Sequence, residues 1–139
     1  LYGSDGTLCA TMPAAQGFTI GYVHSINLSP VDEVFSVSEC GMLVLTEVWF
    51  DQLSTGMPYG DEDGFSVEGG RFVTRPNRAF ASIQLRVSPV PGHVITLKNG
   101  TKKALTRWAK PAGLLVLTAA PRVRPCAEPS KEAPWLPTP

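Results

Sequence analysis

The side chains in this sequence that could most readily do chemistry are two histidines and a glutamate, His24, Glu33 and His93. Imidazole and carboxylate groups bind metal ions, and they also form the hydrogen bonds of ligand sites. If the segment from Ser25 to Asp32 closes a symmetric hairpin, His24 lies opposite Glu33, and the next hairpin places Thr46 beside Glu33. The sequence therefore predicts an apolar field on one face of the sheet that ends in a polar trio, His24, Glu33 and Thr46. The field consists of Ile20, Tyr22, Phe35, Val37, Met42 and Val44.

Two interpretations of this trio are open. The His–Glu pair is either a hydrogen-bonded clamp that holds the loop between two strands, or part of a ligand-binding or metal-binding site. Ser25 belongs to that loop, and a second loop leaving from the same end could cover the trio with Gly56, Met57 and Pro58. The second histidine, His93, joins the site only if the loop before it folds toward the same end.

No common catalytic template accompanies these residues. The sequence has no G-x-S-x-G, no glycine-rich phosphate loop and no H-E-x-x-H. Two histidines and a carboxylate without a characteristic spacing give a zinc site little support. We therefore expect a non-catalytic binding or accessory module that needs no cofactor. The alternative is a metal-assisted hydrolase or small-ligand-binding protein at the His24/Glu33 end of the sheet, with His93 as a third metal ligand.

The elements that must position these side chains are β-strands. Short runs of β-branched and aromatic residues recur between turn residues, and no stretch keeps the apolar period of a helix. We expect an all-β, antiparallel sandwich or flattened barrel of about nine or ten strands. The expected strands are Leu8–Thr11, Phe18–His24, Asp32–Ser38, Met42–Phe50, Phe65–Glu68, Arg71–Thr74, Ala81–Val87, His93–Lys98, Thr101–Leu105 and Leu114–Ala119. Gly69-Gly70 and Asn99-Gly100 predict tight hairpins, and Glu39-Cys40-Gly41 predicts a tight turn.

The 139 residues fit one domain, which we place at residues 1–120. Residues 121–139 are rich in proline, which cannot continue a sheet, so we expect a tail packed on the domain or on a partner through Trp135 and Leu136. The chain starts at Leu1 rather than Met, and we expect any membrane anchor to lie in a segment outside this chain.

Charge and cysteine content narrow the partners and the compartment. Twelve basic residues balance twelve acidic ones, which argues against nucleic acid as a partner. Of the three cysteines, Cys126 is the expected member of one disulfide, because it would fix the tail, and its partner is Cys9 or Cys40.

Two motifs resemble a known bacterial family. Gly21-Tyr22-Val23-His24-Ser25 and Pro30-Val31-Asp32-Glu33-Val34-Phe35 are similar to the Y-x-H-S…P-V-x-E-x-F signature of domain-of-unknown-function family 1850. The agreement continues with Thr46-Glu47 before Phe50, with Gly56-Met57-Pro58 and with the segment from Arg86 to His93. The resemblance covers the chain from about Leu8 to Ala119. Val48 and Trp49 stand where the family pattern has a basic residue, and the cysteines and the tail lie outside the pattern.

The resemblance implies export and a periplasmic or other extracytoplasmic location, and it implies no known reaction. Genes of this family commonly lie beside those of TRAP transporters of the TAXI type. The resemblance therefore implies an accessory role next to solute uptake, with a TAXI-type substrate-binding protein or the TRAP membrane subunits as partners.

Overall fold

The computed structural model describes residues 1–53, 64–88, 90 and 92–122. The described chain is nearly all β, with one short 3-10 helix and no α-helix. The elements are β1 (Tyr2–Gly3), β2 (Phe18–Val23), β3 (Pro30–Val37), β4 (Leu43–Phe50), β5 (Ser66–Glu68), β6 (Arg71–Thr74), β7 (Arg78–Phe80), β8 (Ile83–Arg86), β9 (Val94–Leu97), β10 (Lys102–Ala104), η2 (Leu105–Arg107) and β11 (Leu114–Leu117). No helix among these residues is long and apolar enough to cross a membrane.

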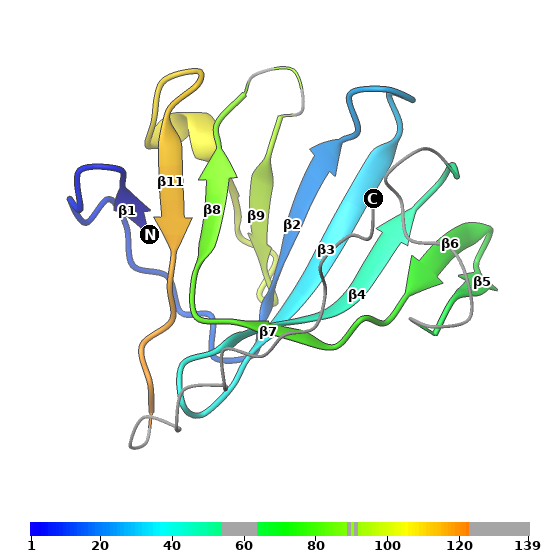
Figure 1. Ribbon diagram of the computed structural model, residues 1–139, viewed down its shortest axis with the longest axis horizontal. Coiled ribbons are helices and arrows are strands. Elements are labelled where there is room, and N and C mark those ends of the chain that lie inside the picture. Colours follow the sequence, from blue (N-terminus) through cyan, green and yellow to red (C-terminus); the bar gives the residue numbers. More distant parts are fainter. Residues whose placement is uncertain (54–63, 89, 91, 123–139) are drawn as a thin grey trace, which may run out of the picture.

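The strands form two antiparallel sheets that do not close into a barrel. The eight-stranded sheet has the order β10-β9-β2-β3-β4-β6-β5, with β7 paired to β4, and the three-stranded sheet has the order β1-β11-β8. Figure 1 shows the small sheet beside the β9 and β2 half of the large sheet, while β4, β6 and β5 extend away from it. The predicted antiparallel sandwich is confirmed, and the flattened barrel is not.

The core is divided in the same way as the sheets. The larger hydrophobic cluster joins both sheets, for example Phe18 and Ile20 of β2 with Leu115 and Leu117 of β11. The smaller cluster has Val31, Val48 and Phe50 at its centre, with partly buried neighbours that also come from β2, β4, β6 and the start of β5. The small sheet contributes no described residue to this second cluster, so it packs against only one half of the large sheet.

Most of the predicted strands and turns are confirmed. Leu97 donates its backbone N–H to Thr101 O at 2.9 Å across the Asn99-Gly100 turn, where Gly100 has a φ of 85° that suits glycine. The Gly69-Gly70 hairpin and the turn around Cys40 also form. Two predictions are wrong: the first strand is β1 rather than Leu8–Thr11, and β7 was not expected. Leu8 makes only an isolated bridge with Tyr2.

The first hairpin has a different register from the one that the residue count predicts. Ile20, not His24, lies opposite Glu33, and Tyr22 lies opposite Val31. The cause is a shorter loop: His24 donates its N–H to Ser29 O at 2.8 Å, and the strand restarts at the very next residue. The error is four residues, an even number, so the same side chains still face the core.

The second hairpin differs from its predicted register because β4 contains a bulge. Val34 pairs with Glu47, whereas Phe35 pairs with Leu45, so Thr46 is an extra residue on β4. Thr46 donates its hydroxyl to Val34 O at 3.1 Å. The residue beside Glu33 is therefore Val48 and not Thr46, which corrects the predicted position of Thr46.

Candidate functional site

Glu33 lies on the inner face of the large sheet, in a row of apolar side chains. Paired residues of adjacent antiparallel strands point to the same face. Ile95, Ile20, Glu33, Val48 and Thr74 form one such row across β9, β2, β3, β4 and β6. Within β2, β3 and β4, which are described in full, Glu33 is the sole acidic residue that the register places on this face. Burying a carboxylate among apolar side chains is costly, so its partners decide what this site can do.

Tyr22 is the hydrogen-bond partner of Glu33. The Tyr22 hydroxyl donates to Glu33 Oε1 at 3.1 Å. Burial raises the pKa of the Glu33 carboxyl, and the hydrogen bond from Tyr22 opposes that rise. Burial and the neighbouring carboxylate raise the pKa of Tyr22, so the phenol keeps its proton and stays a donor. One oxygen of the carboxylate thus has a neutral partner, and the site keeps the capacity to accept further hydrogen bonds.

His93 approaches the same site from the start of β9. Its ring lies against that of Tyr22, with 5.1 Å between the ring centroids. Burial lowers the pKa of His93, which favours the neutral imidazole near neutral pH. The Nδ1 atom of His93 is buried and has no hydrogen-bond partner. A neutral ring nitrogen in this position can accept a hydrogen bond from a bound molecule.

Several polar atoms near this end of the sheet lack partners. Within the part of the chain that the structure describes, the buried side-chain atoms without a hydrogen bond are Asn27 Oδ1, Ser29 Oγ, Thr74 Oγ1 and His93 Nδ1. Thr74 has no exposed surface and shares the row of Glu33, two strands away. A buried polar group without a partner costs roughly 1–3 kcal/mol, so native proteins keep few of them. Such a group on the same face as a buried acid points to a binding site.

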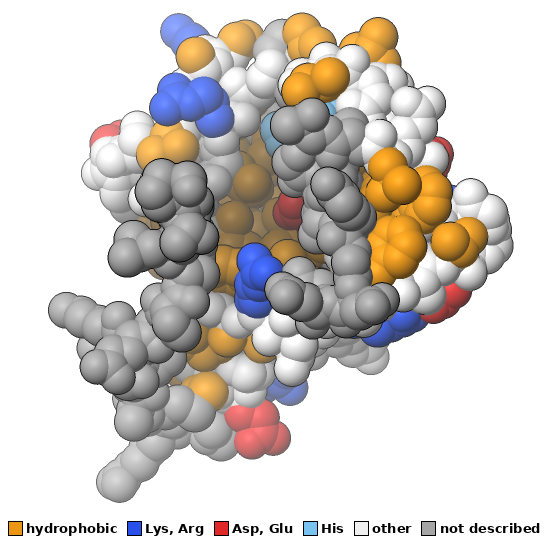
Figure 2. Space-filling model, turned by 45° about the vertical axis from the view of Figure 1, so that its right-hand side comes forward, with side chains coloured by type: hydrophobic (Ala, Val, Ile, Leu, Met, Phe, Trp, Pro, Cys, Tyr) orange, Lys and Arg blue, Asp and Glu red, His pale blue; other side chains and the backbone are white. Residues whose placement is uncertain are grey.

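The inner face is hollowed on this side of the molecule. Figure 2 shows acidic side-chain surface inside a depression whose coloured walls are mainly hydrophobic, with histidine surface above it and Lys or Arg surface at its lower edge. This is the half of the large sheet against which the small sheet does not pack. We call this part of the inner face, with Tyr22, Glu33, Thr74 and His93, the Glu33 hollow.

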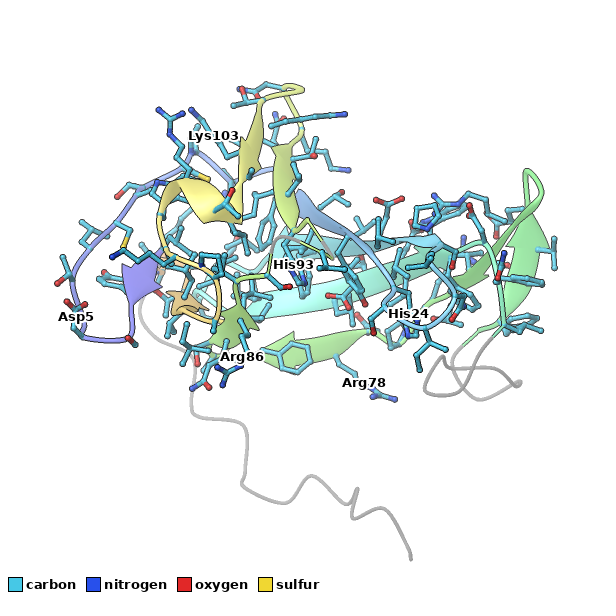
Figure 3. The ribbon with its side chains drawn as sticks, turned by 90° about the horizontal axis from the view of Figure 1, so that it is seen from above. Asp5, His24, Arg78, Arg86, His93 and Lys103 are labelled. Atoms are coloured by element: carbon cyan, nitrogen blue, oxygen red, sulfur yellow. The ribbon has the colours of Figure 1, made fainter. Side chains whose placement is uncertain are left out.

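The predicted trio is not brought together. His24 lies four residues beyond the partner of Glu33, which is about 13 Å at the usual rise of a strand. Its Nδ1 instead accepts the N–H of Ile26 at 3.3 Å, within the loop at the end of β2. The predicted pairing of His24 with Glu33 is therefore wrong for the clamp and for the ligand site alike. Figure 3 shows His24 at that loop and His93 farther along, between the sheets.

The other predicted site residues have mixed outcomes. Ser25 is exposed in the loop that follows β2. Gly56, Met57 and Pro58 lie outside the described residues. Among the described residues there is no group of three His, Cys, Asp or Glu side chains placed to hold a metal ion. Sequence reasoning missed the roles of Tyr22 and Thr74, although Tyr22 already stood in the predicted apolar field.

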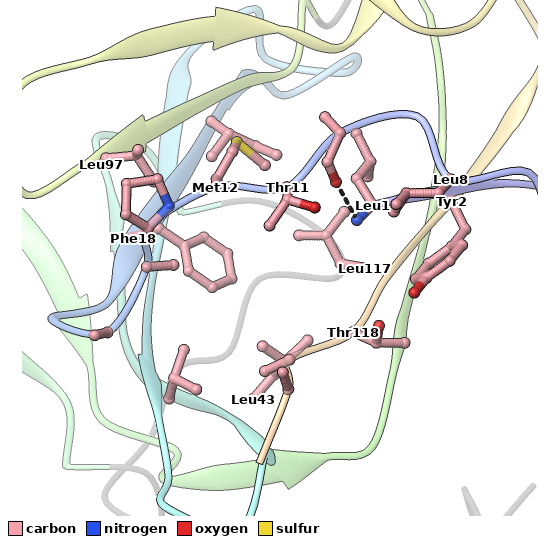
Figure 4. Close-up of a pocket in the computed structure, with 18 of the residues that line it drawn as sticks. Leu1, Tyr2, Leu8, Thr11, Met12, Phe18, Leu43, Leu97, Leu117 and Thr118 are labelled. Atoms are coloured by element: carbon pink, nitrogen blue, oxygen red, sulfur yellow. Dashed lines mark hydrogen bonds between the residues drawn. The ribbon is translucent and has the colours of Figure 1, made fainter. Parts of the chain in front are cut away.

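A separate apolar cavity of about 490 Å³ lies between the N-terminal segment, β11 and the lower ends of β2 and β4. Figure 4 shows Leu1, Met12, Phe18, Leu43 and Leu117 around it. Tyr22, Glu33 and His93 do not line it. Its walls are mainly hydrophobic, with Thr11, Thr118 and Arg122 as the polar side chains that line it, so they offer few groups to distinguish one apolar ligand from another. The hollow, with its acid and imidazole, is the better candidate for a specific site.

Fold and site together define an open antiparallel β-sandwich with a half-buried acid on the half of its inner face against which the small sheet does not pack. A family described as a domain of unknown function (DUF1850) matches residues 18–103, and the chain belongs to this family. The matched residues include β2, which carries Tyr22, and β3, which carries Glu33. They also include β4, and β9 with His93 directly before it. No curated protein and no solved structure matches the chain.

Proposed function

We propose that this chain is a non-catalytic, extracytoplasmic binding module, accessory to a TAXI-type TRAP solute-uptake system. The observation that carries the binding role is the Glu33 hollow, where a half-buried acid and a buried hydroxyl share one face with an unpartnered imidazole nitrogen. The uptake role and the location outside the cytoplasm are what the resemblance of the two sequence motifs implies, and DUF1850 itself is described only as a domain of unknown function.

The chemistry of the hollow favours binding over catalysis. The proton of Tyr22 is held by a raised pKa, so the phenol is a poor general acid at neutral pH. Within the described residues the acid has this phenol as its hydrogen-bond partner, and no sequence template supplies an activated nucleophile. A few convergent polar groups in an apolar hollow are typical of ligand sites.

A pull-down tests the accessory role. The immobilised chain would be exposed to the TAXI-type substrate-binding protein and to the detergent-solubilised membrane subunits from the same organism, at micromolar concentrations. We expect at least one of them to be retained. The control is the same chain after thermal unfolding, which should retain neither. Retention of neither partner by the folded chain would refute the accessory role.

A further inference from the structure

Within the part of the chain that the structure describes, Glu33 differs from the other acidic residues of the large sheet in having no cationic partner. On the opposite face, two arginines bind the carboxylates. Arg71 pairs with Asp32 at 2.8 Å and with Asp51, and Arg75 pairs with Glu47 at 3.5 Å and Glu68 at 2.9 Å. Glu33 takes part in none of these ion pairs, and its hydrogen bond comes from a neutral phenol. A buried carboxylate that ionises without a cation is costly, and a cation supplied by a ligand would remove that cost.

The basic residue that the register places nearest on this face is Arg78, which pairs with Leu45 one row below Glu33. Arg78 is exposed, and in Figure 3 its side chain extends outward beyond β7. It is absent from the causes that set the pKa of Glu33, which are burial and the Tyr22 hydrogen bond. The charge of Glu33 is therefore not balanced by this arginine.

The remaining polar groups of the hollow can all accept hydrogen bonds. Glu33 accepts through its carboxylate, Thr74 through its buried hydroxyl and His93 through the buried Nδ1 of a neutral ring. An ammonium group has three N–H donors and no acceptor, so it complements acceptors of this kind. An anionic ligand would meet the carboxylate at the floor of the hollow and be repelled by it.

Hydrophobic side chains adjoin the acid. Tyr22 and Leu45 are half-buried beside Glu33, and Phe72 packs its ring 5.6 Å from that of Phe50 in the next row of the inner face. An aliphatic or aromatic carbon body fits such walls better than a sugar or a phosphate does.

We propose that the Glu33 hollow binds a small organic amine, with the ammonium group on the Glu33 carboxylate and an apolar body against the neighbouring hydrophobic side chains. This ligand class rests on the proposed function, which makes the hollow a binding site. The binding step forms no covalent bond and needs no metal ion.

Calorimetric titration with matched probes tests the ligand class. The probes are n-hexylamine and 2-phenylethylamine, their neutral counterparts 1-hexanol and 2-phenylethanol, and the anion hexanoate, all at a pH where the amines are protonated. We expect each amine to bind about tenfold or more tightly than its alcohol, as loss of a buried charge-assisted hydrogen bond implies. Hexanoate should not bind.

Two variants distinguish amine binding in the hollow from amine binding at a surface acid. Glu33→Gln keeps the size of the side chain and removes its charge, so it should weaken amine binding about tenfold or more. Glu68→Gln is the matched control, because Glu68 is an exposed acid on the opposite face and is paired with Arg75. It should bind the amines as the native chain does. The thermal transition of each variant confirms that it is folded.

Several outcomes would overturn the amine proposal. If amines and alcohols bind equally well and Glu33→Gln has no effect, the proposal that the ligand is an amine is refuted. The hollow would then be an apolar binding site, and the proposed function as a binding module would stand. Tighter binding of hexanoate would make the hollow an anion site. Tighter binding of Nα-acetyl-lysine amide than of any free amine would make the ligand a protein lysine. Absence of amine binding in a chain that retains its transporter partner would refute the ligand class alone.

Discussion

The hydrogen bond between Tyr22 and Glu33 gives a stability prediction that depends on pH. Tyr22→Phe removes the donor that lies 3.1 Å from Glu33 Oε1 and leaves the ring in place. A hydrogen bond to an ionised group contributes roughly 1.5–3 kcal/mol, and one between neutral groups roughly 0.5–1.5 kcal/mol. We therefore expect Tyr22→Phe to lower the free energy of unfolding by about 2 kcal/mol where Glu33 is ionised and by about 1 kcal/mol where it is protonated.

The direction of the pH dependence follows from the raised pKa of Glu33. Between the pKa of the unfolded chain, about 4.3, and the higher pKa of the folded chain, the folded state binds more protons. The free energy of unfolding therefore falls as the pH rises through this window. Without the opposing hydrogen bond the pKa of Glu33 rises further, so the fall in Tyr22→Phe is larger. His93 contributes the opposite trend, because its lowered pKa costs stability as the pH falls below about 6.5, but this contribution is shared by all the variants compared.

Urea denaturation at a series of pH values from about 4 to 9 measures this difference, with the double variant Tyr22→Phe/Glu33→Gln closing a thermodynamic cycle. In the Glu33→Gln background, Tyr22→Phe should cost about 1 kcal/mol at every pH. Tyr2→Phe is the control, because Tyr2 is an exposed tyrosine at the other end of the fold, and its change should stay within about 0.5 kcal/mol. A Tyr22→Phe loss that is the same at both ends of the pH range would refute a buried, ionisable Glu33 as its partner.

Three further changes test the backbone, the hollow and the tail. Gly17→Ala should destabilise the domain by about 3 kcal/mol or more in chemical denaturation, because Gly17 has a positive φ and a Cβ there would clash with a backbone carbonyl of β3. The control Gly6→Ala, at a similar φ but with open space around it, should cost only about 1 kcal/mol, and equal losses for the two variants would contradict the clash. Thr74→Val replaces a buried, unpartnered hydroxyl with a methyl group, so the free energy of unfolding should stay the same or rise by up to about 1 kcal/mol in thermal denaturation. A marked fall in the free energy of unfolding would mean that the hydroxyl has a partner. Non-reducing mass spectrometry should find Cys40 joined to Cys126, and three free thiols would refute the disulfide.

The choice of Cys40 rests on the chain path just before the tail. Cys9 carries a free thiol, which excludes it from the two predicted partners. Arg122 donates its backbone N–H to Glu39 O at 2.7 Å, so residue 122 lies beside the turn that holds Cys40. Four residues can span about 13 Å, which is enough for residue 126 to return to this turn. The disulfide itself remains a prediction.

The sequence was sufficient to predict the faces of β2 and β3 but not their register. The face of the first half of β4 was predicted wrongly: Met42 and Val44 were expected to face inward, whereas Leu43 and Leu45 pair with Val37 and Phe35 because of the bulge. Alternation of apolar residues assigned Ile20, Tyr22 and Phe35 to the inner face, and the structure places them there. Register depends instead on where a loop ends, and the count assumed that the segment from Ser25 to Asp32 is all loop. Proline is accepted as the first residue of a strand, and Pro30 takes that position, which shortens the loop by three residues at that end.

The candidate site was predictable only in part for the same reason. Glu33 was identified correctly as a polar residue on an apolar face, and His93 as a second candidate. Their connection through Tyr22 could not be deduced, because Tyr22 was assigned to the apolar field and its hydroxyl was not considered. Thr74 lies on β6, and no local sequence signal says that β6 pairs with β4 and so places this residue in the row of Glu33.

The bulge at Thr46 determines which side chains of β4 face the core. Leu43 and Leu45 face inward at odd positions, whereas Val48 and Phe50 face inward at even positions, so the alternation changes phase within one strand. Deletion of Thr46 would restore a single phase. The deletion would leave Leu43, Leu45, Val48 and Phe50 all facing inward. A regular β4 that kept Thr46 but had no bulge, with Leu43 and Leu45 in the core, would instead turn Val48 and Phe50 outward and place Glu47 and Trp49 on the inner face beside Glu33. The bulge that accommodates Thr46 therefore keeps a second carboxylate, that of Glu47, out of the Glu33 hollow.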